Sequence, residues 1–548
     1  MKNLKSLLLF FFFSLNVFSL FSQNIDEVLN SIDYENFYKH LSFLAGDELK
    51  GRDVGSEGFN MAADYVVNEF KNNNIKPFGD NGTYFQKIEF VRPSIISSSV
   101  LFTVENKSKE ITGKFAENIT ILPSSKYDKY DEKSELVFVG FGNIIKDKYI
   151  NDYEGVDVNG KIVIVSLGGP KDMKDPAFDD FFAKINNAKN SGAIGIILFY
   201  PGAGALQGLI FKRVSTLLTE MIFNYKDASI KGAMFDIDIQ LAIYAKRDFI
   251  KDILKQNDIS FKKEFKKMEN GENCSKELNS IVNVSFEMKN KVINCKNVVG
   301  ILPGSDSVLK NEYVVIGAHL DHLGVGKPVK GDSIYNGMWD NASGSAAVLS
   351  IAKAFNEFAE NPKRTIIFIC YTAEEKGLLG SNFYAQKNNV KDGKIVAVLN
   401  IDMVGSLYET TDIVPLGYNH SNLSEAIDYA AEKLNLKISD SKKREDLYLE
   451  RSDQISFIKK GIPALNIGQG TTSVNPDEDY TKELNNWWKN YYHEPSDDLN
   501  QKFSEQEFLT SVKTNFLTLY YISNILEEVK WNKESKFYEK YVLKTENK

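Results

Sequence analysis

The sequence predicts an α/β fold, a mostly parallel sheet sandwiched by helices, with a β-rich α/β domain inserted into it. Apolar runs of strand length alternate with helical segments from residue 313 to about 405, and this alternation is typical of parallel strands with helices on both faces. A separate block of short apolar strands lies earlier in the chain, between about 116 and 280. A length of 548 residues also exceeds what one hydrophobic core organises, so more than one domain is expected.

Composition and charge exclude several classes of protein. Hydrophobic residues make up 43% of the chain and charged residues 26%, which are ordinary values for a globular protein and not for a disordered or multi-span membrane protein. The formal net charge is -8, and the lysines are interleaved with acidic residues. Because phosphate binding needs clustered Lys and Arg, no nucleic-acid partner is expected.

The N-terminus has the pattern of a secretory signal peptide. Lys2 and Lys5 precede an apolar run from residue 7 to about 21, and small and polar residues follow it. The run is shorter than the roughly 20 residues that span a membrane, and Asn16 interrupts it. A membrane anchor is the alternative. We predict instead that residues 1–22 are removed and that the protein is exported, periplasmic or secreted, with no stable membrane insertion.

The three cysteines form no metal-binding CxxC motif. Cys370 lies in the apolar stretch RTIIFICYT and is expected to be a small buried hydrophobic side chain. Cys274 and Cys295 are the plausible disulfide pair in an exported protein, and the sequence leaves open whether the bond forms.

Changes of pattern along the chain predict its domain organisation. Helical periodicity and a glycine-punctuated loop, DELKGRDVGSEG, open the N-terminal part of the main domain, which we place at residues 23–115. Residues 116–280 form the inserted domain, and residues 281–548 form the remainder of the main domain. Ligands of such open sheets bind at the carboxyl ends of the strands, so the chemistry is expected there.

The first motif with chemical character is GAHLDHLG, residues 317–324, directly after an apolar strand. His319 is the candidate metal ligand, since an imidazole nitrogen suits zinc. Asp321 stands two residues later, where its carboxylate is expected to hold the ring in one tautomer. His322, by contrast, is expected to be an ordinary core or surface histidine.

Four further motifs carry acidic residues or histidine. NGMWDNASG contains Asp340, for which helix capping is the alternative role. TAEEKGLLGS contains Glu374 and Glu375, which serve one cavity only if the strand gives way to a loop there. LNIDMVG places Asp402 at the end of an apolar strand, where an uncompensated carboxylate is costly. The last motif, YYHEPSDDLN, contains His493.

Together these motifs predict a site for two zinc ions. Two histidines and three carboxylates from separate segments provide the mixed nitrogen and oxygen ligands that suit a pair of zinc ions. The predicted ligands are His319, Asp340, Glu375, Asp402 and His493.

The order of the motifs resembles metallopeptidase family 28, the co-catalytic di-zinc aminopeptidases. The resemblance covers nearly the whole mature chain, including GRDVGSEGFNMAADYV, SDQISF and GIPALNIG. Residues 116–280 resemble a protease-associated domain in NDYEGVDVNGKIVIV and KNSGAIGIILF. One departure is Met338 and Trp339, where the family more often has alanine and then a variable residue, and we expect it to reshape the rim of the pocket.

The resemblance implies a zinc-dependent exopeptidase, most simply an aminopeptidase that hydrolyses N-terminal residues from peptides. A hydroxide held by two zinc ions would attack the scissile carbonyl, with Glu374 as the general base. Asp321 would be the partner of His319. The implied ligands of one zinc are His319 and Asp402, those of the other are Glu375 and His493, and Asp340 bridges them.

Other activities occur on the same fold and stay open. The alternatives are a glutaminyl cyclase-like acyltransferase with one zinc, a carboxypeptidase, and a metal-free binding protein. The liganding residues do not discriminate between an aminopeptidase and a carboxypeptidase. Candidates for lining the cavity are Met338, Trp339, Arg451 and Asp453, of which Asp453 is equally a candidate helix cap. Side-chain specificity and oligomeric state are not predicted.

Overall fold

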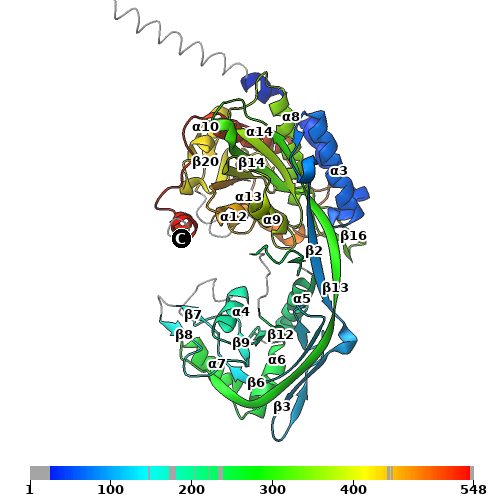
Figure 1. The fold of residues 1–548 in the computed structure, drawn as a ribbon, viewed down its shortest axis with the longest axis vertical. Helices are drawn as coiled ribbons and strands as arrows, with labels where there is room; N and C mark the ends of the chain where they lie inside the picture. Colours follow the sequence, from blue (N-terminus) through cyan, green and yellow to red (C-terminus); the bar gives the residue numbers. More distant parts are fainter. Residues whose placement is uncertain are drawn as a thin grey trace, which may run out of the picture. The chain divides into compact units, whose positions relative to one another are not determined.

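The computed structural model describes most of the chain (Figure 1). The described residues are 25–145, 149–171, 181–202, 204–220, 222–231, 239–440, 445 and 448–543. The predicted signal peptide, residues 1–22, lies outside them. Within these ranges, none of the helices combines the length and the apolar character that crossing a membrane requires.

The chain divides into two compact units. The first unit consists of Met1–Ile88 and Asn294–Lys548, and the second consists of Glu89–Ile293. The second unit is therefore longer than the insert expected at residues 116–280. The reason is strand pairing: β3 (Leu101–Glu105) lies antiparallel to the segment 281–285 of the long strand β13 (Lys276–Leu302), so both belong to the second unit.

The sheet of the first unit has a parallel centre. Strands β17, β14, β18 and β21 pair in parallel, whereas the pairs β1–β13, β13–β17 and β19–β21 are antiparallel. This confirms the α/β fold with a mostly parallel sheet. In order of pairing the strands are β1 (Lys76–Pro77), β13, β17 (Thr365–Tyr371), β14 (Glu312–His319), β18 (Lys394–Asn400), β21 (Ala464–Gln469), β19 (Asp412–Leu416) and β20 (Lys437–Ile438).

Helices cover both faces of this sheet, because alternate side chains of a strand point to opposite faces. Phe368 of β17 packs against Phe70 and Phe355, which belong to α3 and α8. On the opposite face of the sheet, Ile369 and Tyr371 of β17 belong to a hydrophobic core that includes Phe457 of α12 (Gln454–Ile458). The helices of the first unit are α2 (Tyr34–Leu44), α3 (Glu57–Asn72), α8 (Ser343–Asn356), α9 (Leu379–Lys387), α10 (Ser424–Leu434), α12 (Gln454–Ile458), α13 (Tyr480–Asn490) and α14 (Glu505–Asn524) (Figure 1).

The central strands are buried because they consist almost entirely of apolar residues. Every residue of β17 is buried, as are the last six of β14. When a strand is buried on both faces, polar side chains can reach solvent or a ligand only at the ends of the strand. The first polar side chains after β14, β17 and β18 therefore gather at one edge of the sheet.

The second unit has its own sheet and its own core. Alternate residues of β9 divide between two hydrophobic clusters, since Ile162 and Ile164 belong to one and Val163 and Val165 to the other. The strands in order of pairing are β4 (Glu110–Thr112), β3, β13, β6 (Lys129–Phe138), β9 (Ile162–Ser166), β10 (Gly195–Phe199), β12 (Leu241–Ala245) and β5 (Ile119–Ile121). Its helices are α4 (Phe181–Asn190), α5 (Ala205–Glu220), α6 (Arg247–Gln256) and α7 (Phe261–Glu269).

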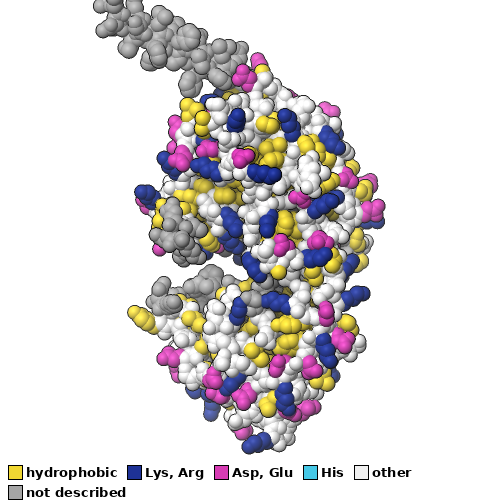
Figure 2. All heavy atoms as spheres, viewed as in Figure 1, with side chains coloured by type: hydrophobic (Ala, Val, Ile, Leu, Met, Phe, Trp, Pro, Cys, Tyr) yellow, Lys and Arg dark blue, Asp and Glu magenta, His cyan; other side chains and the backbone are white. Residues whose placement is uncertain are grey.

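The cysteines are not paired with one another, and charges of both signs are mixed on the surface seen in Figure 2. Cys274, Cys295 and Cys370 are all buried and free, so the Cys274–Cys295 disulfide that the sequence left open is not formed. On the face seen in Figure 2, Lys and Arg side chains alternate with Asp and Glu side chains and do not gather into one patch.

Candidate metal centre

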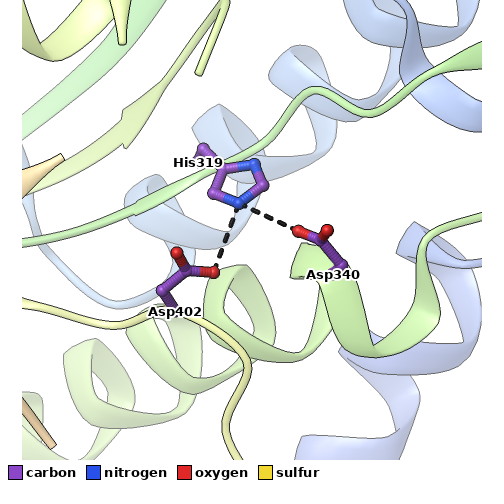
Figure 3. A group of neighbouring side chains, drawn as sticks. All are labelled: His319, Asp340 and Asp402. Atoms are coloured by element: carbon purple, nitrogen blue, oxygen red, sulfur yellow. Dashed lines mark ion pairs between the residues drawn. The ribbon is translucent and has the colours of Figure 1, made fainter. Parts of the chain in front are cut away.

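His319 is the last residue of β14, and its side chain points into a group of carboxylates (Figure 3). Nε2 lies 3.2 Å from Oδ1 of Asp340 and 3.3 Å from Oδ1 of Asp402. The other ring nitrogen, Nδ1, lies 3.1 Å from the main-chain carbonyl oxygen of Asp321. Because a carbonyl only accepts, Nδ1 carries the proton and Nε2 keeps its lone pair for a metal.

The carboxylate of Asp321 has a different role from the one expected. It accepts the backbone N–H of Glu374 at 3.1 Å and that of Glu375 at 3.3 Å, while only the main-chain carbonyl of Asp321 contacts the His319 ring. We expected the carboxylate of Asp321 to orient the imidazole of His319, but its main-chain carbonyl makes that contact. The chain turns after β14 and directs the Asp321 side chain to the end of β17. Burial raises the pKa of Asp321 to about 6.

Asp340 stands between the two histidines of the predicted ligand set. Its Oδ1 faces Nε2 of His319, and its Oδ2 lies 3.3 Å from Nε2 of His493. The alternative role as a helix cap is not observed, since α8 starts at Ser343 and its N-cap residue Ala342 makes no side-chain capping bond. One carboxylate that offers one oxygen to each side has the arrangement of a bridging ligand.

Asp402 follows β18 and is held by a hydroxyl group. Ser452 Oγ donates to its Oδ2 at 2.6 Å, and Asn400 donates to Ser452 Oγ at 2.9 Å. The other oxygen, Oδ1, has no hydrogen-bond partner among the described residues and faces His319. A buried carboxylate oxygen without a donor is a costly arrangement unless a cation occupies the space before it.

Glu375 and His493 lie on the other side of Asp340. Nε2 of His493 is 3.3 Å from Oε2 of Glu375. The second oxygen of Glu375, Oε1, lies 2.7 Å from Nδ1 of His322. Two histidines therefore reach this carboxylate, and donor atoms of His322, Asp340 and Glu375 all lie within 4.8 Å of one another.

The lengths of the histidine–carboxylate contacts distinguish a metal ligand from a hydrogen-bond partner. Ligand atoms about 2.0–2.1 Å from a tetrahedral zinc lie about 3.3–3.4 Å from each other. The four contacts made by Nε2 of His319 and Nε2 of His493 measure 3.2, 3.3, 3.3 and 3.3 Å. The His322–Glu375 contact of 2.7 Å is instead the length of a charge-assisted hydrogen bond. The five predicted ligands thus fit a pair of zinc ions, and His322 does not take the place of His493.

The electrostatics of the cluster favour cations. Burial lowers the pKa of His493, but the carboxylates of Glu375 and Asp340 outweigh it and raise this pKa to about 9. Burial likewise opposes protonation of His319, whose pKa Glu374, Asp340 and Asp402 hold well above its usual range. A field that favours a proton on these rings also favours a divalent cation between them.

Glu374 lines the cavity together with His319, Asp340 and Asp402. Burial, reinforced by the carboxylates of Glu375 and Asp453, raises its pKa well above the ordinary value for glutamate. A carboxylate with a raised pKa beside a metal cluster is suited to accept and return a proton near neutral pH.

A cavity of about 530 Å³ opens beside this cluster. Arg451 lines it, as expected. Its other walls are mainly apolar and aromatic, formed by Met403, Val414, Leu416, Tyr448, Leu484, Trp488 and Tyr492, with polar groups from Ser452, Asn466, Gln469 and Asn485.

Three of the residues proposed for the cavity walls are buried elsewhere. Met338 and Trp339 are 1% and 3% exposed, and Trp339 packs edge-on against Trp487 of α13 at 4.5 Å between ring centroids. Their side chains belong to the protein core, so they do not form the rim. Asp453 is fully buried and makes no capping bond to α12, so it neither lines the cavity nor caps the helix.

The structure adds three site residues that sequence reasoning missed. His322 contacts Glu375, Ser452 donates to Asp402, and the carboxylate of Asp497 accepts the backbone N–H groups of Trp339 and Asp340. The signal for His322 was its place within GAHLDHLG, and that for Asp497 was its place four residues after His493. Neither spacing reveals which distant residue such a side chain meets.

Comparison with known proteins shows which part of the chain is similar to a known family. Residues 297–519, which carry all five predicted ligands, match the family model described as peptidase family M28. Residues 297–519 are thus similar to peptidase family M28. This confirms the resemblance seen in the sequence motifs. The match does not extend to the second unit, so the protease-associated domain stays a prediction.

Two curated relatives have names that imply cleavage at opposite ends of a peptide. Leucine aminopeptidase 2 of Trichophyton equinum is 31% identical over 188 residues, which are 33% of this chain and 35% of that protein. The match therefore spans about a third of the length of that relative. The glutamate carboxypeptidase 2 homolog of Caenorhabditis elegans is 23% identical over 530 residues, 85% of this chain and 63% of that protein.

A solved structure has the same fold. The aminopeptidase from Aneurinibacillus sp. strain AM-1 aligns with a TM-score of 0.53 and 20% identity, covering 92% of this chain and 98% of that one. At this identity the likeness is one of fold alone.

Proposed function

We propose that the protein is a zinc-dependent exopeptidase, an aminopeptidase that removes N-terminal residues from peptides with the help of two zinc ions per chain. The observation that carries the proposal is the pair of histidine nitrogens, on His319 and His493, each about one tetrahedral ligand separation from two carboxylate oxygens. Asp340 takes part in both groups. Such an arrangement suits two ions that share one ligand.

The residues of the chain divide the catalytic work among them. Zinc ions, when bound, would acidify a water molecule and polarise the scissile carbonyl of the peptide. Glu374 would accept the proton of the attacking water and return it to the leaving amine. Asp321 supports this role, because its carboxylate accepts the N–H of Glu374 and so holds the turn that carries the base.

The charges of the cavity favour a substrate with a free amino group. Glu374 lines the cavity and is not one of the five proposed ligands, so its carboxylate attracts an ammonium group and repels a terminal carboxylate. The apolar and aromatic walls suit an uncharged, hydrophobic first side chain. We therefore propose that peptides with an apolar N-terminal residue are the preferred substrates.

A carboxypeptidase is the second candidate, and one observation favours it. Arg451 is an exposed lining residue of the cavity, where a guanidinium could receive the α-carboxylate of a substrate. If Arg451 has this role, Arg451→Gln raises KM for C-terminal cleavage and leaves cleavage of aminoacyl anilides unchanged.

A panel of substrates tests the proposal. Leucyl, phenylalanyl, glutamyl and lysyl anilides, N-acetyl-leucyl anilide and N-blocked peptides with a free carboxyl end are assayed with and without a zinc chelator. We expect cleavage of the free leucyl and phenylalanyl substrates, none of the acetylated one, and loss of activity with the chelator that added zinc restores. Cleavage only of the N-blocked peptides would support the carboxypeptidase instead.

The same panel separates the remaining alternatives. A glutaminyl cyclase-like acyltransferase would cyclise N-terminal glutamine with one zinc, and a metal-free binding protein would cleave nothing. The presence of five candidate ligands together with Glu374 favours hydrolysis over both. Cyclisation of a glutaminyl peptide without hydrolysis of the leucyl substrate would overturn the proposal.

We also propose that the protein is exported and that the second unit contains a protease-associated domain. Support for export comes from Lys2 and Lys5 before the apolar run of residues 7–21. Sequencing the N-terminus of protein recovered outside the cytoplasm tests it. We expect a chain that begins at Gln23, whereas retention of Met1 would contradict cleavage.

A further inference from the structure

His322 is a completely buried histidine with one side-chain hydrogen bond. It follows β14, three residues after His319, and its Nδ1 lies 2.7 Å from Oε1 of Glu375. The other ring nitrogen, Nε2, has no hydrogen-bond partner among the described residues. The contact with Glu375 is therefore the polar interaction that explains an imidazole at this position.

The ring is held in place from several sides. Its main-chain N–H donates to the carbonyl of Arg52 at 3.3 Å. The ring lies on the bare backbone of Gly337, where an added Cβ would come within 2.5 Å of it. It also meets the His493 ring at 72° and 5.7 Å between centroids. The surroundings thus leave His322 little freedom to turn its Nδ1 away from Glu375.

The hydrogen bond divides the two oxygens of Glu375 between two partners. A carboxylate oxygen only accepts, so Nδ1 of His322 carries the proton and donates it to Oε1. Oε2 is left facing Nε2 of His493 at 3.3 Å, which is about the separation of two ligands on one zinc. With Oε1 fixed, the rotation of the carboxylate about its last bond is fixed as well.

We propose that His322 is a positioning residue for the second metal site, which holds Glu375 with Oε2 directed at the ion shared with His493. The inference rests on the proposed function, since it presupposes that Glu375 and His493 bind one zinc. Groups that hydrogen-bond to metal ligands commonly contribute 10–100-fold to metal affinity. We expect the effect of His322 at this site, because within the described part of the chain it makes no hydrogen bond to His319 or Asp402.

Substitutions of similar shape test the inference. Asn places an amide N–H at the δ position, where the donor of His322 stands, whereas Leu has nearly the same size as Asn and no donor. Zinc content of the purified full chain is measured against increasing concentrations of a competing chelator. We expect His322→Leu to lose one of its two zinc ions about 10–100-fold more readily than wild type, and His322→Asn to stay within about threefold of wild type.

Further variants give the inference its controls. His322→Gln moves the amide one atom outward and should behave like the Leu variant, so the comparison of Gln with Asn stands even if the Leu protein does not fold. His40 is another buried histidine, bonded to Tyr65 at 2.8 Å, and His40→Leu should leave both zinc affinities unchanged. In a His493→Asn background, His322→Leu should have no further effect on zinc content.

The outcomes separate this inference from the proposed function. Wild-type protein that binds no pair of zinc ions contradicts the proposed function itself. Wild-type protein with two zinc ions, and equal affinities in the Asn, Leu and Gln variants, overturns the role of His322. Equal losses in all three variants overturn it too, because they would make the imidazole ring a ligand or a packing element and not a hydrogen-bond donor.

Discussion

The carboxylate of Asp497 accepts the backbone N–H of Asp340 at 3.0 Å. Its other oxygen accepts the N–H of Trp339 at 2.9 Å, and the side-chain amide of Gln501 donates to the same carboxylate. Trp487 donates to Gln501 in turn at 2.6 Å. The segment that carries His493 therefore also fixes the loop that carries Asp340, and the two proposed ligands of one ion share a common support.

Asp497→Asn should weaken this support. An asparagine offers one acceptor where the loop presents two N–H groups, and an unpaired buried donor costs about 1–3 kcal/mol. We expect zinc affinity or kcat to fall about 10–100-fold, as measured by chelator competition and by leucyl-anilide hydrolysis. The neighbouring Asp498→Asn is the matched control and should behave as wild type, because the Asp498 carboxylate bonds to Asn500 and to no ligand of the site among the described residues.

Glu374→Gln should separate catalysis from metal binding. The amide cannot accept a proton, so kcat should fall about 10²–10⁴-fold, while the zinc content stays that of wild type because Glu374 is not among the five ligands. Hydrolysis rates and zinc analysis of the same sample measure both quantities. Full activity in this variant would show that another group is the base.

The acid limb of the pH profile should report Glu374. Burial raises its pKa, the active form is the carboxylate, and activity is therefore complete above this pKa and lost as the pH falls through it. We expect the acid limb of kcat to lie above the ordinary glutamate value of about pH 4.3 and to be absent from the residual activity of Glu374→Gln. A wild-type limb at or below that value is incompatible with this assignment.

Glu507 should make the stability of the first unit depend on pH. It is 2% exposed, and burial raises its pKa to about 7 although Thr410 donates to both of its oxygens. The folded state thus binds the proton more tightly than the unfolded chain, so stability is highest below about pH 4 and declines as the pH rises to about 7. Relative to wild type, Glu507→Gln should gain of the order of 2 kcal/mol in the free energy of unfolding between pH 5 and pH 8. A difference that is the same at both pH values would contradict it.

The sheet of the first unit was predictable because its strands carry a strong local signal. The segments that became β14, β17 and β18 have apolar centres, and each ends at or shortly before a polar residue of the site. A strand buried on both faces cannot keep a carboxylate within its length, so the positions of His319, Glu375 and Asp402 at strand ends follow from the sequence.

The boundary of the second unit was not predictable from such patterns. β13 is one continuous strand of 27 residues that pairs with β3 and β6 in one half and with β17 in the other. Alternation of side chains reveals a strand and not its partners. The change of partner within β13 therefore left no mark in the sequence, which placed residues 89–115 in the main domain, whereas they lie in the second compact unit.

The partners of the ligands were the least predictable part of the site. His322 meets Glu375 across 53 positions, and Asp497 meets Asp340 across 157. Carboxylates and histidines at the ends of buried strands suggest a metal site, because such buried polar side chains need a partner. The side chains that hold those ligands are chosen by tertiary packing, so the sequence could suggest Asp321 as a partner of His319 but not which of its atoms makes the contact.

Metal titration of the purified, metal-free full chain is the sharpest test for a pair of zinc ions that share Asp340. Zinc is added stepwise while bound zinc and leucyl-anilide hydrolysis are both measured, for wild type and for Asp340→Asn. We expect two zinc ions per wild-type chain with activity that requires them, and loss of the paired binding when the bridging carboxylate of Asp340 is removed. Hydrolysis by the zinc-free chain, or an Asp340→Asn protein that binds two zinc ions as tightly as wild type, would contradict this expectation.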